Sequence, residues 1–190
     1  LGVLLLAGCA GDPEPIVTET PTPTATALES PSPTPTPSAT ALTDEEVIAA
    51  LPEAARAQDF WGAQEFARFF IIESQEMFRT GDTSVFQAVS DRECDFCNRS
   101  LTEFEEYAAN GYTLEGGEIT VVSTVPMGTC SVNFDCHVEL DIEIAAAQVI
   151  SPDGATIEEY PLEQLRVAVA CVFEAGHWIA TGVGAEVREA

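Results

Sequence analysis

The sequence contains no lysine, and its seven basic residues are all arginines. Against them stand 32 acidic residues, so the formal net charge is -25. So large an excess of negative charge repels the phosphate backbone of nucleic acids and the headgroups of anionic lipids. We therefore expect no nucleic-acid partner and no direct electrostatic attachment to a membrane.

Long apolar runs are also missing after the first few residues, so no later segment is predicted to span a bilayer. The apolar residues 4–8 are followed directly by Cys9 and then by a polar, proline-rich chain. An apolar segment that ends in small residues is typical of an export signal. Leu6-Ala7-Gly8-Cys9 resembles the lipobox of bacterial lipoproteins. This resemblance implies cleavage before Cys9 and attachment of lipid to its thiol.

Three parts are predicted along the chain. Residues 1–8 are the end of a lipoprotein signal peptide, residues 9–42 are the lipidated Cys9 and a disordered Pro/Thr-rich tether, and residues 43–190 are a single globular α+β domain. The tether cannot bury enough apolar surface to fold, and its prolines favour an extended chain. We expect the acyl chains on Cys9 to hold the domain at the extracytoplasmic face of the cell membrane.

Helices are predicted in the first half of the domain. Apolar residues recur at three- and four-residue steps from residue 60 to residue 80, which predicts a long amphipathic helix that Gly81 ends. Thr43 and Glu46 form a capping-box pattern at the start of an earlier helix. Three shorter helices are predicted in all, at residues 44–51, 83–89 and 100–110.

The second half of the domain alternates with a period of two, which predicts antiparallel strands. Four strands are predicted, at residues 119–125, 136–144, 157–173 and 177–179, the third with a bulge at Pro161. Helices followed by an antiparallel meander predict an α+β domain. In it, the N-terminal helices pack on one face of a curved four-stranded antiparallel sheet, and Trp178 lies in the core.

Several short motifs are spread over this domain: residues 62–70, residues 80–83, Cys94-x-x-Cys97, Gly116-Gly117 and Trp178. Together with the long first helix, they resemble a family of uncharacterised actinobacterial lipoproteins with a nuclear-transport-factor-like, cone-shaped domain. That family has no assigned activity. The resemblance therefore implies a fold and a location only.

The Cys94-x-x-Cys97 motif has three interpretations. In an exported protein, a structural disulfide that pins a loop is the plainest of them. A redox-active pair would need a stabilised thiolate and usually a βαβ unit, whereas Glu93 and Asp95 disfavour a thiolate here. A zinc site would need further cysteine or histidine ligands to complete a tetrahedron.

Cys130 and Cys136 flank a predicted hairpin tip and are the favoured second disulfide. Cys136 with Cys171 is the alternative, because both lie on the inward phase of strands that can be neighbours. Apart from the lipobox cysteine the chain has five, so one is unpaired; under the favoured pairing it is Cys171, a buried thiol. Cys130, Cys136 or His137 could instead complete a zinc site, but no second Cys-x-x-Cys pair is present.

Charged residues alternate with aliphatic ones along the second predicted strand. His137, Glu139, Asp141 and Glu143 share one face, which could hold a cation or supply a general base. Such alternation is expected of any half-buried strand, and we interpret the row as a solvated face. Arg166 is predicted to lie across from it as a cross-strand partner.

No residue matches the catalytic base of enzymes with the cone fold, so we assign no catalytic residue, metal ligand or cofactor. The leading hypothesis is a non-enzymatic, lipid-anchored cell-envelope protein that binds a partner protein or a small ligand. A pocket enzyme of the isomerase or cyclase type is the alternative, and a thiol-disulfide oxidoreductase using Cys94 and Cys97 is the third. A deep apolar cavity with an acid or histidine at its floor would favour the pocket enzyme, and a filled interior would exclude it.

Overall fold

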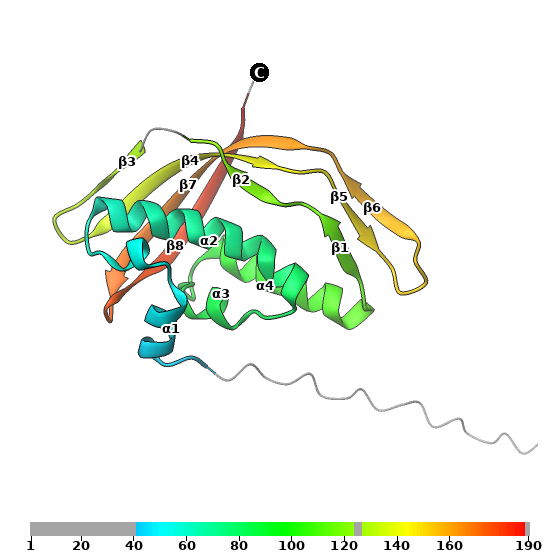
Figure 1. Ribbon diagram of the computed structural model, residues 1–190, viewed down its shortest axis with the longest axis horizontal. Helices are drawn as coiled ribbons and strands as arrows, with labels where there is room; N and C mark the ends of the chain where they lie inside the picture. The colour runs from blue at the N-terminus through cyan, green and yellow to red at the C-terminus, as the bar shows by residue number, and fades with distance from the viewer. Residues whose placement is uncertain (1–40, 124–126, 189–190) are drawn as a thin grey trace, which may run out of the picture. The chain divides into compact units, whose positions relative to one another are not determined.

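The computed structural model describes residues 41–123 and 127–188. Cys9, the predicted tether up to residue 40 and Val125 of the first predicted strand lie outside these ranges. Within them, helices come before strands along the chain (Figure 1). The helices are α1 (Asp44–Ala50), the 3-10 helix η1 (Glu53–Arg56), α2 (Phe60–Thr80), α3 (Ser84–Ala88) and α4 (Asp95–Asn110). The strands are β1 (Thr113–Gly116), β2 (Ile119–Val121), β3 (Met127–Cys130), β4 (Asp135–Ile144), β5 (Ala147–Ile150), β6 (Thr156–Tyr160), β7 (Glu163–Glu174) and β8 (His177–Val187).

The long helix α2 has the bounds that the sequence predicts. It begins after Asp59, whose carboxylate accepts a hydrogen bond from the backbone N–H of Gly62 at 2.8 Å. It ends at Gly81, which takes the left-handed conformation with φ 75° that a C-cap favours. The predicted apolar face is buried: Ala63, Phe66, Ala67, Phe70 and Met77 are all 0% exposed.

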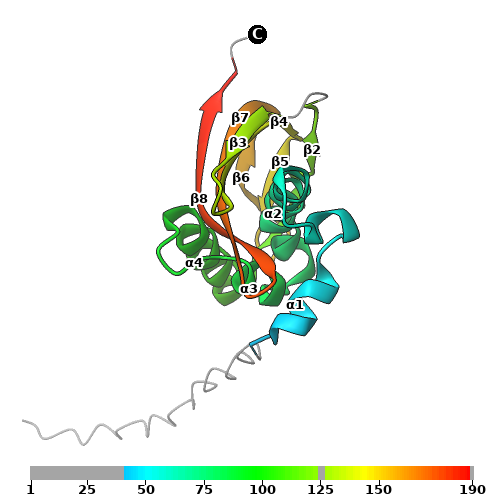
Figure 2. The same ribbon diagram turned by 90° about the vertical axis from the view of Figure 1, so that its left-hand side faces the viewer.

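The capping box at the start of α1 is also confirmed. The hydroxyl of Thr43 accepts a hydrogen bond from the backbone N–H of Glu46 at 3.4 Å, and the Glu46 carboxylate accepts one from the backbone N–H of Thr43 at 2.9 Å. The turned view in Figure 2 places α1 and α3 together at the end of the domain that holds the β7–β8 turn. This arrangement closes that end of the core.

Helix α4 begins five residues earlier than the sequence predicts. Cys94 is its N-cap, with a sulfur that accepts a hydrogen bond from the backbone N–H of Cys97 at 3.2 Å. Ser100, the predicted first residue, lies inside the helix, where its hydroxyl donates to the Phe96 carbonyl at 3.0 Å. The prediction was wrong because a cysteine is not among the usual N-cap residues.

The strands form two antiparallel sheets, so the prediction of one four-stranded sheet was wrong. One sheet has the order β1-β5-β6, and the other has the order β2-β4-β7-β8 with β3 also paired to β4. Pro161 breaks the predicted third strand into β6 and β7 because a proline cannot donate to a ladder, and the two parts belong to different sheets. Strands β1, β3 and β5 are not predicted by the sequence.

Three chain segments run from one sheet to the other, and the points at which they cross lie along one line. Ile119, Ile144 and Glu163 are register partners at the end of the larger sheet, and Gly116, Ala147 and Tyr160 are register partners at the end of the smaller one. The strands therefore bend together across this line, and α2 and α4 lie on the inner side of the bend (Figure 1).

The main core lies between α2 and the inner face of the larger sheet. Val138, Leu140 and Ile142 of β4 are at most 2% exposed. Trp178 of β8 is fully buried as predicted, and its indole N–H donates to the Ala57 carbonyl at 3.0 Å. Among the described residues, no helix combines the length and the apolar character needed to cross a membrane.

Candidate functional site: a cavity at the bend of the sheets

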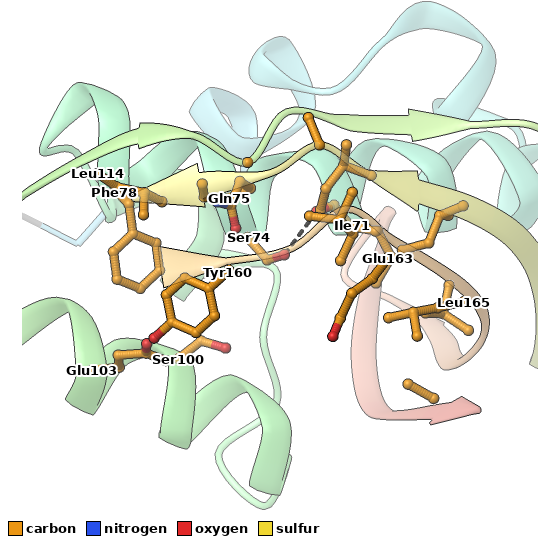
Figure 3. Close-up of a pocket in the computed structure, with 18 of the residues that line it drawn as sticks. Ile71, Ser74, Gln75, Phe78, Ser100, Glu103, Leu114, Tyr160, Glu163 and Leu165 are labelled. Atoms are coloured by element: carbon orange, nitrogen blue, oxygen red, sulfur yellow. Dashed lines mark hydrogen bonds between the residues drawn. The ribbon is translucent and has the colours of Figure 1, made fainter. Parts of the chain in front are cut away.

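A cavity of about 510 Å³ lies between α2, α4 and the bent strands (Figure 3). Its wall is mainly apolar and includes Ile71, Phe78, Phe96, Leu114, Ile142 and Leu165. Small residues at the bend also line it, among them Gly117, Ala145 and Ala147. The sheets bend around the helices at this line, and side chains this short leave space between the strands and the helices.

The polar groups deepest in the cavity belong to the helices. Ser74 of α2 is 8% exposed, and its hydroxyl donates to the Ile71 carbonyl at 2.7 Å (Figure 3). Ser100 of α4 donates to the carbonyl of Phe96. Helix carbonyls therefore already accept from both hydroxyl groups.

Charged and aromatic side chains lie at two places on the rim of the cavity. Glu103, Tyr107 and Tyr160 lie at one end, which we call the mouth, whereas Glu163 lies beside Leu165 (Figure 3). Glu103 and Tyr107 come from α4, Tyr160 ends β6 and Glu163 begins β7, and all four line the cavity. Glu103 and Glu163 are exposed, which places them at the rim rather than at the floor. Figure 3 shows the ring of Tyr160 reaching toward Glu103.

The pKa values of Glu103, Tyr107 and Tyr160 are shifted toward the neutral forms. Partial burial raises the pKa of Glu103, and repulsion from Glu158 and Glu106 raises it further. Burial is also the main cause of the raised pKa of Tyr107 and of Tyr160. Both phenols are therefore protonated at neutral pH, and the mouth carries excess negative charge from its carboxylates.

A comparison with known protein families shows which family the chain belongs to. The model of DUF6318, described as a family of unknown function, matches residues 48–184. The chain belongs to this family. Among curated proteins, none matches the sequence.

Two solved structures illustrate the similarity to known folds. The intermembrane space region of the chloroplast protein ARC6 shares 14% identity over 66% of this chain and 97% of its own, with a TM-score of 0.46. A five-substitution variant named Rd1NTF2_05 shares 12% identity over 64% of this chain and 97% of its own, with a TM-score of 0.38. Neither similarity bears on the function of this DUF6318 chain.

The Cys94-x-x-Cys97 motif lies at the start of α4, next to the cavity. The two side chains have a geometry compatible with a disulfide, and both are 0% exposed. A helix N-terminus stabilises a thiolate, but a reactive pair must also be accessible to its partner. Phe96 lies between the two cysteines and lines the cavity. A disulfide between them would pin the turn that supports one wall of the cavity.

The other described cysteines lie side by side on three strands. Cys130 of β3 is the register partner of Cys136 of β4, which is in turn the register partner of Cys171 of β7. Cys130 and Cys136 have a geometry compatible with a disulfide, and Cys171 is a buried, unpaired thiol. None of the three lines the cavity.

The acidic row of β4 lies away from the cavity, on the other face of the sheet. Arg166 lies across from this row, as predicted: it is the register partner of Asp141 and donates two hydrogen bonds to the Asp141 carboxylate at 2.8 and 3.2 Å. These bonds lower the pKa of Asp141, and Arg188 adds a smaller effect. His137 and Glu139 are largely solvated, with side chains 53% and 38% exposed. The row is an outer surface on which Asp141 pairs with both Arg166 and Arg188.

Sequence reasoning missed the mouth of the cavity. No binding or catalytic motif in the sequence includes Glu103 or Tyr107. The clearest available signal is the run Glu158-Glu159-Tyr160-Pro161, in which charged residues and an aromatic ring come just before a proline that ends a strand. That signal is weak, because only the fold brings β6 next to α4.

Proposed function

We propose that this protein is a lipid-anchored cell-envelope protein whose domain binds a small apolar molecule in the cavity. The observation that carries the proposal is the cavity itself, with a volume of about 510 Å³ and a mainly apolar wall. Small-molecule sites in proteins are typically concave, largely apolar and roughly 300–1,000 Å³ in volume. A filled interior would have argued for a surface that binds only other proteins.

The location of acidic groups favours binding over catalysis. An isomerase or cyclase in this type of cavity needs a base close to the buried part of its substrate. The carboxylates that line the cavity, Glu103 and Glu163, are exposed at its rim. A thiol oxidoreductase is not favoured either, because Cys94 and Cys97 are fully buried.

The anchor and the finer fold assignment belong to the same proposal. The lipobox-like Leu6-Ala7-Gly8-Cys9 and the proline-rich stretch after it support a lipidated Cys9 on the extracytoplasmic face of the membrane, as in actinobacterial lipoproteins. The long helix α2 on the inner side of bent antiparallel sheets supports a nuclear-transport-factor-like cone. Such a protein would hold an apolar ligand at the membrane surface.

Binding of the neutral fluorescent probe Nile red tests the ligand-binding function. The full chain with Cys9→Ser would be titrated with the probe, and we expect saturable binding at one site. Ala145→Phe puts a ring into the cavity and should weaken binding about tenfold or more, which is about 1.4 kcal/mol. Ala146→Phe is the matched control, because Ala146 is exposed and does not line this cavity.

Two outcomes would contradict the proposal. One is the absence of saturable binding, and the other is equal binding by the Ala145→Phe and Ala146→Phe variants. Thermal unfolding of both variants checks that they fold. Ala185→Phe fills the same cavity from an exposed position on β8 and replaces Ala145→Phe if that variant is unstable.

A further inference from the structure

The charges around the cavity mouth are unbalanced. Glu103 and Glu163 line the cavity, whereas Arg99 is the only cation among its lining residues in the described part of the chain. Arg99 also shares the outer surface of α4 with Asp95 and Glu106. Its positive charge is therefore more than offset by carboxylates on its own helix, and the mouth is negative.

Strand β6 adds to the negative charge at the mouth. Glu158 of β6 lies close enough to Glu103 to raise its pKa by repulsion, together with Glu106. The whole chain, at -25, has the same sign. An anionic headgroup would be repelled at the mouth, whereas a cationic one would be attracted both at a distance and in contact.

Aromatic rings stand at the same end of the cavity as these carboxylates. Phe78 and Tyr107 contact each other edge to face, with ring centroids 5.3 Å apart. Figure 3 shows Phe78 and Tyr160 at the end of the cavity where Glu103 lies. Aromatic faces attract ammonium groups, and sites for such groups often combine rings with a carboxylate.

The opposite end of the cavity has a different character. Its walls include Ile142, Leu165 and Val167, and the charged side chain on this side is that of Glu163, which is exposed at the rim (Figure 3). A ligand that fills the cavity therefore needs an apolar body and can place a charged group only at the rim, where the aromatic rings distinguish the Glu103 end from the Glu163 end. Burial of a charge deeper than the rim would carry the full cost of desolvation.

We propose that the ligand is a cationic amphiphile, with an apolar tail in the cavity and an ammonium group at the mouth beside Glu103 and Tyr160. This inference rests on the proposed ligand-binding function and adds the chemical class of the ligand. Glu103 is the residue that distinguishes a cationic headgroup from a neutral or anionic one. In the free protein Glu103 is repelled by Glu158 and Glu106, whereas a bound ammonium group would attract all three carboxylates.

Competition among three ligands with the same tail tests the inference. Decylamine, decanol and decanoate would each displace Nile red from the full chain with Cys9→Ser, below the concentrations at which they form micelles. We expect decylamine to compete about tenfold better than decanol, and decanoate to be the weakest. Glu103→Gln should abolish the advantage of decylamine and leave decanol unchanged.

The matched control for Glu103 is Glu105, an exposed residue of the same helix that does not line the cavity. Glu105→Gln removes the same charge and should keep most of the preference for decylamine. Equal competition by the three ligands, a preference for decanoate, or equal effects of both variants would overturn the inference while ligand binding stands. Failure of Nile red to bind at all would overturn the proposed function as well.

Discussion

Cys171 shows how the fold controls the chemistry of one side chain. It lies on β7 with its thiol in the core, opposite Cys136 of β4. Burial raises its pKa to about 12, and the nearby charge of Asp135 contributes. Because folding raises the pKa of this thiol, the buried neutral thiol makes its full contribution to the free energy of unfolding below the ordinary thiol pKa. That contribution is lost as the pH rises from the ordinary value toward 12.

The reactivity of thiols tests both this burial and the two disulfides. In the full chain with Cys9→Ser, a thiol reagent at about pH 8 should find no reactive thiol in the native protein, because the thiolate is the reactive form. After unfolding without a reductant, it should find one thiol, that of Cys171. Three or more thiols in the unfolded protein would show that a predicted disulfide is absent.

At the scale of elements, the bend between the two sheets shapes the cavity. Gly116 ends β1 at this line with φ 82°, a conformation that glycine adopts at little cost. A Cβ atom there would collide with the carbonyl oxygen of Ala146, next to the β4–β5 connection. At the bend, the backbone of Gly116 therefore lies so close to the backbone of Ala146 that a residue with a side chain would not fit at position 116 without a shift.

Gly116→Ala should destabilise the domain more than a glycine substitution in open space. Gly154→Ala is the matched control, because Gly154 has φ 84° and a methyl group there would meet no atom within 4 Å. Both changes incur the left-handed penalty of about 1–2 kcal/mol. The collision at Gly116 should add about 1–3 kcal/mol in the free energy of unfolding, measured with urea. Equal losses for the two variants would mean that the bend tolerates a side chain.

For the whole molecule, charge and anchorage act together. A chain of net charge -25 is repelled by anionic lipid headgroups, so electrostatics cannot hold it at a membrane. The proposed lipid on Cys9 would supply that attachment through buried acyl chains, and more than one chain is needed for stable anchoring. The negative domain would then stand away from the surface.

Cys9→Ser should therefore release the protein from the membrane. In cells that lipidate the precursor, fractionation should find the unchanged protein with membranes and the variant in the aqueous fraction. Cys171→Ala is the control, since it removes a cysteine that the proposed lipid does not use. Equal membrane retention of the two variants would contradict the anchor and require another mode of attachment.

Several features of the domain were predictable from the sequence because they depend on local interactions. The bounds of α2 follow from its apolar period and from Gly81, and the position of Arg166 across from the acidic row follows from the alternation along two long strands. The burial of Trp178 follows from its size and apolar surface.

Other features were decided only by the tertiary structure. The start of α4 at Cys94, the division of the strands into two sheets and the cavity all depend on segments that are distant in the sequence. Glu103 and Tyr160 lie at one mouth only because the bend brings β6 over α4. Local patterns determine which residues face inward. The meeting of those faces, and the space left between them, is set by packing across the whole domain.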